Sequence, residues 1–402
     1  MNFKVKLFIV FCFVSVSLPV LAQTTKPAVL VVGNGNAAAA AAIQSAVSGV
    51  KTTLLLQSGG FDIAPLRDEL HSGVQATFLK KINESKGIKD SLAITSFDKI
   101  LANDVLTKWT DSLKNLTVIK NVVYSKGSRS GNSWTFKLSD GQTIKPRVLV
   151  IANDEKLKTM LSIATIPVSE PVALDYSTTL HRTSVASGIE IGGKNSTIFS
   201  MYNLFLPLQE NLIWLKSNDG MIVGQAAGAT AAYAGFFGTK LSEANLKTIQ
   251  GELINYKLAL MPFSDIVLTD SNWKAIQFVG LTGMLKANIN NGRALFLPDQ
   301  QVKVDEVKQP IKDFFYKAQI WFDDHNAQEL NLKSTIELVS YVGNKSPENT
   351  LKEVEKKWKN TYKLSSDFDL NKTVTRREFA ILLQDYLPPF NVNVDKNGKV
   401  VR

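Results

Sequence analysis

The feature that most constrains this chain is a short glycine turn between an apolar run and an alanine-rich segment. The apolar run Val29–Val32 ends in Gly33-Asn34-Gly35-Asn36-Ala37-Ala38, and alanines continue to Ala42. A second apolar run, Thr52–Leu56, follows and stops at Gln57. Short apolar runs without alternation are typical of strands that are buried on both faces of a parallel sheet. The pattern therefore predicts a β-α-β unit and an α/β fold.

The spacing Gly33-x-Gly35-x-x-Ala38 is typical of a dinucleotide-binding turn. The first glycine permits the tight turn, the second lets the backbone approach a diphosphate, and the small third residue allows close helix–strand packing. The helix that follows directs its free amides and the positive end of its dipole at the same place. The predicted cofactor-binding residues here are Gly33, Gly35, Asn36, Ala37, Ala38 and, at the end of the second strand, Gln57. The alternative is an ordinary strand–turn–helix without a ligand.

The first 22 residues have the pattern of a signal peptide. Lys4 and Lys6 precede the apolar segment Leu7–Val14, and Val20-Leu21-Ala22 forms a small-residue cleavage site. We therefore expect a periplasmic or secreted protein. The only cysteine, Cys12, lies in this segment, so the mature chain is expected to have neither a disulfide nor a cysteine-ligated metal.

Charge and composition argue against several classes of function. The 402 residues carry a formal charge of +10, but acidic residues are interspersed and no long basic run occurs. This distribution argues against a nucleic-acid partner, and no apolar run after the signal segment approaches the length of a stable membrane span. His71, His181 and His325 are far apart in sequence, so we predict no metal site.

A longer pattern follows the opening unit. Ser96–Leu113 has helical spacing, strand-like runs follow, Asp140-Gly141 marks a turn, and Arg147–Ile151 is again apolar. A Gly/Ala-rich segment begins Gly224-Gln225-Ala226-Ala227-Gly228. In this order the segments resemble the secreted FAD-dependent oxidoreductases. The resemblance implies a Rossmann-like FAD/NAD(P)-binding domain with a small antiparallel meander.

The same resemblance implies that a helix beginning at the Gly/Ala-rich segment points its N-terminus at the flavin. It adds four cofactor-binding candidates, Gly224, Gln225, Ala226 and Ala227. The alternative is a small-residue helix that packs closely against a sheet.

The chain also departs from that family. Gln57 replaces the acidic residue that holds the adenosine ribose in the family. The segment Ala152-Asn153-Asp154 lacks the family's glycine, and Lys216 lies near the position of a family arginine that this chain lacks. The segment between the two cofactor blocks, where the family places a substrate domain, is short. Two functions stay open: an exported FAD-dependent oxidoreductase whose substrate and catalytic residues are unknown, or a non-catalytic descendant that acts as a binding or scaffold module.

Residues 241–390 are expected to be mainly helical, after a flavin-type domain over 23–240. Asp270–Phe315 resembles an S-layer-homology repeat, and a looser second copy runs from Leu332 to Leu387. Thr375 and Glu378 have the spacing of a helix capping box. The repeats either hold a cell-wall polysaccharide or form a helical bundle against the first domain. The polar tail, 391–402, is expected to be frayed.

Overall fold

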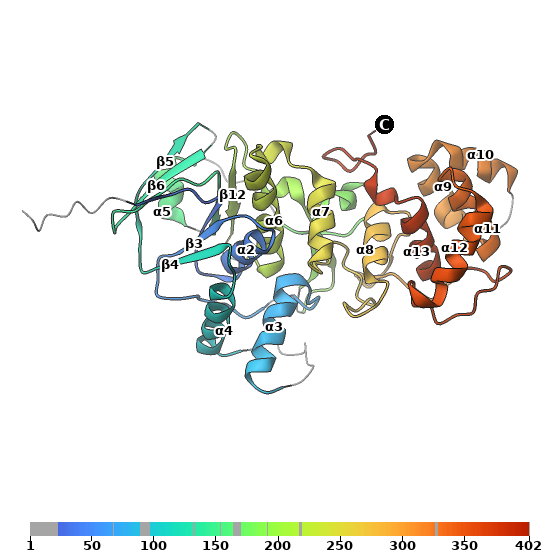
Figure 1. Cartoon of the computed structure of the whole chain (residues 1–402), viewed down its shortest axis with the longest axis horizontal. Helices are drawn as coiled ribbons and strands as arrows, with labels where there is room; N and C mark the ends of the chain where they lie inside the picture. The colour runs from blue at the N-terminus through green and yellow to red at the C-terminus, as the bar shows by residue number, and fades with distance from the viewer. Residues whose placement is uncertain are drawn as a thin grey trace, which may run out of the picture.

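The computed structural model describes residues 23–66, 68–88, 97–131, 133–152, 154–163, 170–190, 192–216, 219–325 and 329–401. The predicted signal segment and Asn153 lie outside these ranges. In Figure 1 the sheet-containing part lies at one end of the molecule and helices α9 to α13 at the other, with α7 and α8 between them.

The fold is organised around a five-stranded parallel sheet. Its strand order is β12-β8-β2-β3-β4, and each neighbouring pair is parallel. The strands are β2 (Val29–Val32), β3 (Thr52–Leu56), β4 (Leu116–Lys120), β8 (Val148–Ala152) and β12 (Leu212–Leu215). The three central strands are almost wholly buried, as their continuous apolar runs predict. The expected α/β class with a Rossmann-like sheet is confirmed.

The predicted meander is also present. Strands β5 (Tyr124–Ser130), β6 (Ser133–Leu138) and β7 (Thr143–Ile144) are antiparallel, and β1 (Thr24–Thr25) adds a parallel edge. Strand β5 begins only at Tyr124. Asn121 has a φ of 58°, and this left-handed residue turns the chain before the strand starts.

Two small-residue helices lie together on the sheet. They are α2 (Asn36–Val47) and α6 (Met221–Phe237). Helices α3 (Gly73–Ser85) and α4 (Lys99–Asp111) pack beside them, and α5 (Glu155–Met160) follows β8. The short region between the two cofactor blocks contains a sheet of order β10-β11-β9, formed by β9 (Val172–Ala173), β10 (Ser184–Ile189) and β11 (Ser196–Ser200).

The C-terminal region consists of helices and one hairpin. In chain order the elements are α7 (Leu246–Asn255), α8 (Trp273–Thr282), β13 (Asn288–Asn290), β14 (Arg293–Leu295), α9 (Val304–Phe314), α10 (Tyr316–Asp324), α11 (Leu332–Val342), α12 (Pro347–Asn360) and α13 (Arg376–Tyr386). Helix α7 does not start directly after α6. A 3-10 turn covers Leu241–Glu243, and α7 starts only after Asn245, whose side chain caps the amide of Thr248.

Helix α10 packs on both α9 and α11, and α11 packs on both α12 and α13. Extended residues before α9, α11 and α13 pair with one another: Gln301 with Thr375, Lys303 with Glu329, and Asn331 with Thr373. The last helix, α13, packs on the first, α8. These contacts join the helices from α8 to α13 into one bundle, in which each helix covers apolar surface of another.

The described part of the C-terminal tail is held in place. The Thr179 hydroxyl donates to the carbonyl of Asn397 at 2.6 Å, and Arg182 donates to the carbonyl of Gly398 at 3.2 Å. Val394 also pairs with Val400. The expectation of a frayed tail is therefore wrong for residues 391–401. Within the described ranges, no helix is both long and apolar enough to cross a membrane.

Candidate functional site

The predicted cofactor-binding residues lie along the carboxyl edge of the parallel sheet. Gly33 follows β2, Gln57 follows β3, and Asp154 lies just beyond β8. Because β8, β2 and β3 are neighbours, their ends bring these residues to one place. Ligands of open α/β sheets bind at such an edge.

The glycine turn has the backbone that the motif predicts. Gly33 has a φ of 138°, and a Cβ there would lie 2.9 Å from the Cβ of Ala152. Gly35 is the N-cap of α2 and supplies no side-chain bond to the first turn. The Asn36 side chain is used internally: it donates to the carbonyl of Ala64 at 3.1 Å and accepts from the amide of Ala64 at 2.9 Å.

Gln57 belongs to a polar cluster that joins three elements. Its amide donates to Oδ2 of Asp154 at 2.6 Å, and the hydroxyl of Tyr124 donates to Oδ1 at 2.8 Å. Asp154 also caps α5 by accepting from the amides of Lys156 and Leu157. Burial, together with the Asp154 carboxylate, raises the pKa of Tyr124, so the phenol stays a donor. The residue expected to hold a ribose therefore holds another side chain.

The small residues of α6 allow two helices to approach closely. A Cβ on Gly224 would lie 2.3 Å from the carbonyl oxygen of Ala37, and one on Gly228 would lie 2.4 Å from that of Ala41. Ala226 and Ala227 are fully buried. These positions thus fit the alternative interpretation, in which α6 is a small-residue helix that packs closely on its neighbours. The closest neighbour of α6 at these positions is α2, in addition to the sheet.

Gln225 lies in the same contact and is 1% exposed. Its side-chain oxygen accepts from the amide of Val74 at 2.8 Å, and its nitrogen donates to Gln44 at 2.8 Å. The residue ties α6 to the start of α3 and to α2. These contacts account for a buried glutamine, which requires hydrogen-bond partners, without a ligand.

The N-terminus of α6 carries an acidic neighbour. Asp219 directly precedes the N-cap Gly220, and its carboxylate accepts from the backbone amide of Lys216 at 2.7 Å. Burial raises the pKa of Asp219 to about 6. The ammonium of Lys216 pairs with Glu170 at 2.6 Å. Ser217 and Asn218 lie outside the described residues.

The glycine turn fits FAD, whereas the side chains around it do not. The open N-cap at Gly35 suits a diphosphate. The ribose position is occupied by the Gln57–Asp154 bond, and a carboxylate stands beside the helix end that would face a reduced flavin. The described residues therefore do not offer FAD a complete set of partners.

A polar cavity of about 370 Å³ lies in the helical region. Its wall holds cationic, amide and acidic side chains, namely Lys286, Asn288, Gln300, Gln301, Lys303, Asp305, Glu306 and Arg376. Arg376 is 4% exposed and donates to the carbonyls of Phe296 and Lys286, both at 2.6 Å. It also pairs with Glu306, and burial lowers its pKa to about 10. The sequence did not identify this cavity, because its wall comes from segments up to 90 residues apart.

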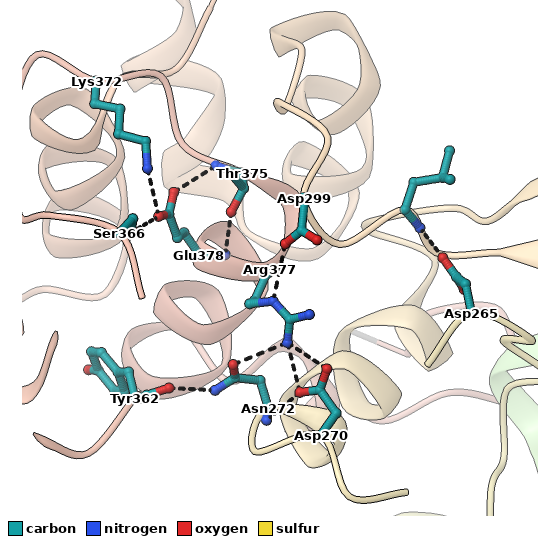
Figure 2. Close-up of polar contacts among 11 residues, drawn as sticks. Asp265, Asp270, Asn272, Asp299, Tyr362, Ser366, Lys372, Thr375, Arg377 and Glu378 are labelled. Carbon is teal, nitrogen blue, oxygen red and sulfur yellow. Dashed lines mark hydrogen bonds and ion pairs between the residues drawn. The ribbon is translucent and has the colours of Figure 1, made fainter. Parts of the chain in front are cut away.

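The loops beside this cavity are fixed by charged side chains (Figure 2). Arg377 donates to both carboxylate oxygens of Asp270 at 2.7 Å. Asp265 accepts from the amides of Phe296 and Leu297. The predicted capping box is confirmed, because Thr375 and Glu378 each bond the other's backbone amide.

The histidines remain separate in space as in sequence. His71 bonds to Gln75, His325 stacks on Trp321, and His181 is buried beside Tyr176. Among the residues that the structure describes, no cluster of histidine, cysteine and acidic side chains could hold a metal ion.

No protein-family model matches the sequence, and no curated protein is similar to it. Similar solved structures include bacillithiol disulfide reductase from Staphylococcus aureus, with 15% identity over 33% of this chain and 39% of that one, at a TM-score of 0.23. Thioredoxin reductase from T. acidophilum has 16% identity over 32% and 35%, at 0.21. The flavin-dependent monooxygenase PieE, solved with FAD and substrate, has 13% identity over 38% and 34%, at 0.28. The chain thus spans less than half the length of each of these oxidoreductases.

Proposed function

We propose that this protein is an exported, non-catalytic binding module built on the fold of an FAD-dependent oxidoreductase. One observation carries the proposal. All three polar side chains among the predicted cofactor positions, Asn36, Gln57 and Gln225, bond within the chain. A flavin enzyme keeps such groups for its cofactor, because the protein's task is to bind and orient it.

The positions of two cavities support the same proposal. The cavity of about 370 Å³ is lined by residues of the segment 286–306 and by Arg376 of α13, far along the chain from the sheet edge. The smaller one, about 270 Å³, lies beside Phe205–Leu212. A pocket for a small substrate is usually at least about 300 Å³ and is walled from several sides.

The helical cavity is the best candidate for the binding role. Lys286 and Lys303 supply positive charge, and Asp305 supplies one negative charge, while Glu306 is paired with Arg376. Amide groups come from Asn288, Gln300 and Gln301. Amides and cations together suit an acidic carbohydrate. We therefore assign cell-wall polysaccharide, as an acidic polymer, to this cavity.

Pull-down of the mature protein on purified cell-wall polysaccharide tests this assignment. The double variant Lys286→Glu/Lys303→Glu should lose retention. Lys80→Glu/Lys81→Glu on α3 is the control with the same charge change, since neither residue lines the cavity. Equal retention of both double variants would refute the assignment.

An FAD-dependent oxidoreductase is the second candidate, and the glycine turn favours it. Gly33 and Gly35 keep the conformation that a diphosphate requires. If this candidate holds, the purified protein carries a flavin or takes up added FAD, and Gly35→Val abolishes the binding.

A further inference from the structure

We propose that the amino edge of the parallel sheet is a docking surface for a membrane that contains anionic lipids. The amino edge is the end at which the parallel strands begin, opposite the glycine turn. It combines three strongly exposed apolar side chains, Leu208, Phe236 and Phe237, with exposed cations. This inference is independent of the proposed function.

The end of α6 presents two phenylalanines to solvent. Phe236 is 65% exposed and Phe237 is 61% exposed, although phenylalanine is one of the residue types most often buried. Their ring centres lie 5.0 Å apart, and the ring of Tyr233 lies 4.7 Å from that of Phe237. The three rings form one aromatic cluster, whose two phenylalanines face water rather than the core.

Leu208 is a second apolar feature of this edge, and its backbone is strained. Its φ is 63°, in the left-handed region that is unfavourable for a bulky residue, and its side chain is 95% exposed. Neither the backbone nor the exposed side chain gains free energy from the core. A strained residue of this kind is typical of a functional position.

Leu208 and the aromatic cluster lie at the same edge. Helix α6 follows β12 and packs on β12, β8 and β2, so its C-terminus returns to the edge at which these strands begin. Arg147, just before β8, donates to the carbonyl of Gly235 near this C-terminus at 3.0 Å. Leu208, just before β12, lines a cavity together with Leu241, which follows α6.

The charges at the amino edge are mainly positive. Each strand of the sheet except β12 is preceded by an exposed lysine or arginine, and within the described ranges none of these four cations forms an ion pair with a carboxylate. They are Lys26 before β2, Lys51 before β3, Lys114 before β4 and Arg147 before β8.

Three acids lie on the adjoining segments, and two of them are already bonded. Glu210, before β12, accepts from the hydroxyl of Ser242 at 2.7 Å. Glu243, after α6, accepts from Thr239 and pairs with Lys240. Asp111, at the end of α4, is the third. The unpaired charge of this edge is therefore positive.

Apolar side chains flanked by unpaired cations are complementary to an anionic membrane surface. Aromatic rings enter the interface, while lysine and arginine side chains stay at the lipid phosphates. Insertion also removes the phenylalanines and Leu208 from water, which offsets the free energy that their exposure costs. A second copy of this chain fits less well, because a two-fold contact would bring the same cations of both copies together.

The experiment mixes the mature protein with vesicles of equal parts phosphatidylethanolamine and phosphatidylglycerol and separates bound protein by flotation. We expect Phe236→Ser/Phe237→Ser to lower the partition coefficient at least about tenfold, since burial of one such side chain changes an equilibrium by about that factor. Tyr316→Ser/Ile320→Ser is the matched control, because these residues of α10 are 79% and 44% exposed but lie in the helical region.

The cations are tested by charge reversal. Lys26→Glu/Lys51→Glu should weaken vesicle binding, and vesicles of phosphatidylcholine alone should retain less of the unaltered protein. Lys352→Glu/Lys356→Glu on α12 has the same charge change at exposed positions away from this edge and should leave binding unchanged.

Leu208→Asn separates docking from a structural role. Asparagine tolerates a positive φ and is polar, so this variant should bind vesicles more weakly and unfold at a higher temperature. If the phenylalanine variant is misfolded by circular dichroism, Leu208→Asn decides the question alone. The proposal would be overturned if the unaltered protein did not bind the vesicles, or if these variants bound as well as the control. A dimer in light scattering that Phe236→Ser/Phe237→Ser dissociates would also overturn it, because a second copy would then cover the surface.

Discussion

Gly224 of α6 and Ala37 of α2 touch through their backbones: a Cβ on Gly224 would lie 2.3 Å from the Ala37 carbonyl oxygen. Gly224→Ala should therefore force the two helices apart. We expect a loss of about 1–3 kcal/mol in the free energy of unfolding, as for other overpacked cores, measured by urea denaturation.

Gly251→Ala on α7 is the control for that substitution. A Cβ there would meet only Cε1 of Phe390, at an ordinary 3.8 Å. Alanine in a helix should stabilise the protein by about 0.4–1 kcal/mol. The same sign for both variants would contradict the packing role of Gly224.

Gln57→Glu should destabilise the protein in a pH-dependent way. It removes the donor to Asp154 and places two carboxyl groups about as close as the present 2.6 Å bond. Such a pair cannot readily ionise twice, so one pKa rises. The stability of the variant should therefore be highest in acid and fall as the pH rises from the ordinary carboxyl pKa of about 4 through the raised pKa, as measured by thermal unfolding across pH.

Gln142→Glu provides a solvent-exposed comparison. Gln142 donates to Asp140 at 2.8 Å, and that pair lies at the surface. Water screens the repulsion there, so the effect should stay below about 1 kcal/mol. An equally small effect at Gln57 would mean that its bond to Asp154 does not persist in solution.

Asp270 and Arg377 should be strongly coupled. The guanidinium donates to both carboxylate oxygens, and the two side chains are only 13% and 20% exposed. A double-mutant cycle with alanine should give a coupling energy of about 1–3 kcal/mol. The exposed pair Asp104–Lys108, also at 2.8 Å, should give about 0.3–0.5 kcal/mol. Similar values for the two pairs would mean that the Asp270–Arg377 ion pair does not help to hold α13 against α8.

Asp68 should make stability fall as the pH rises. Burial raises its pKa to about 6, helped by Glu69 and Glu190, so the folded protein favours the protonated form. Its contribution is complete below the ordinary pKa of 3.8 and is lost as the pH rises through about 6. Asp68→Asn should remove this slope, worth about 1–3 kcal/mol, in unfolding curves recorded across that range.

His181 acts with the opposite sign in an overlapping range. Its pKa is lowered from 6.5 to about 3 by burial, so stability is lost as the pH falls below 6.5. His181→Leu should flatten that loss, whereas Asp68→Asn should make it steeper. Identical profiles for the two variants would show that the pH dependence has another source.

The parts of the fold that depend on local pattern could be predicted from the sequence. The apolar runs at Val29–Val32 and Thr52–Leu56 and the Thr375–Glu378 spacing determine structure within a few residues. The central strands and the capping box appear where they were expected.

The candidate site depends on long-range contacts that one sequence does not reveal. Gln57 meets Asp154 across 97 residues, and Gln225 meets Val74 across 151. Helix α10 lay outside both repeats suggested by the sequence, because its apolar face is short and consists of Ala318, Trp321 and Phe322. Tertiary packing, rather than local preference, selects these partners.

The central claim is tested most directly by titrating the purified mature protein with FAD. The readouts are the visible absorbance and the midpoint of thermal unfolding. The account predicts no bound flavin after purification and no saturable rise in the midpoint with added FAD. A flavin spectrum in the purified protein, or a saturable stabilisation by FAD that Gly35→Val abolishes, would contradict it.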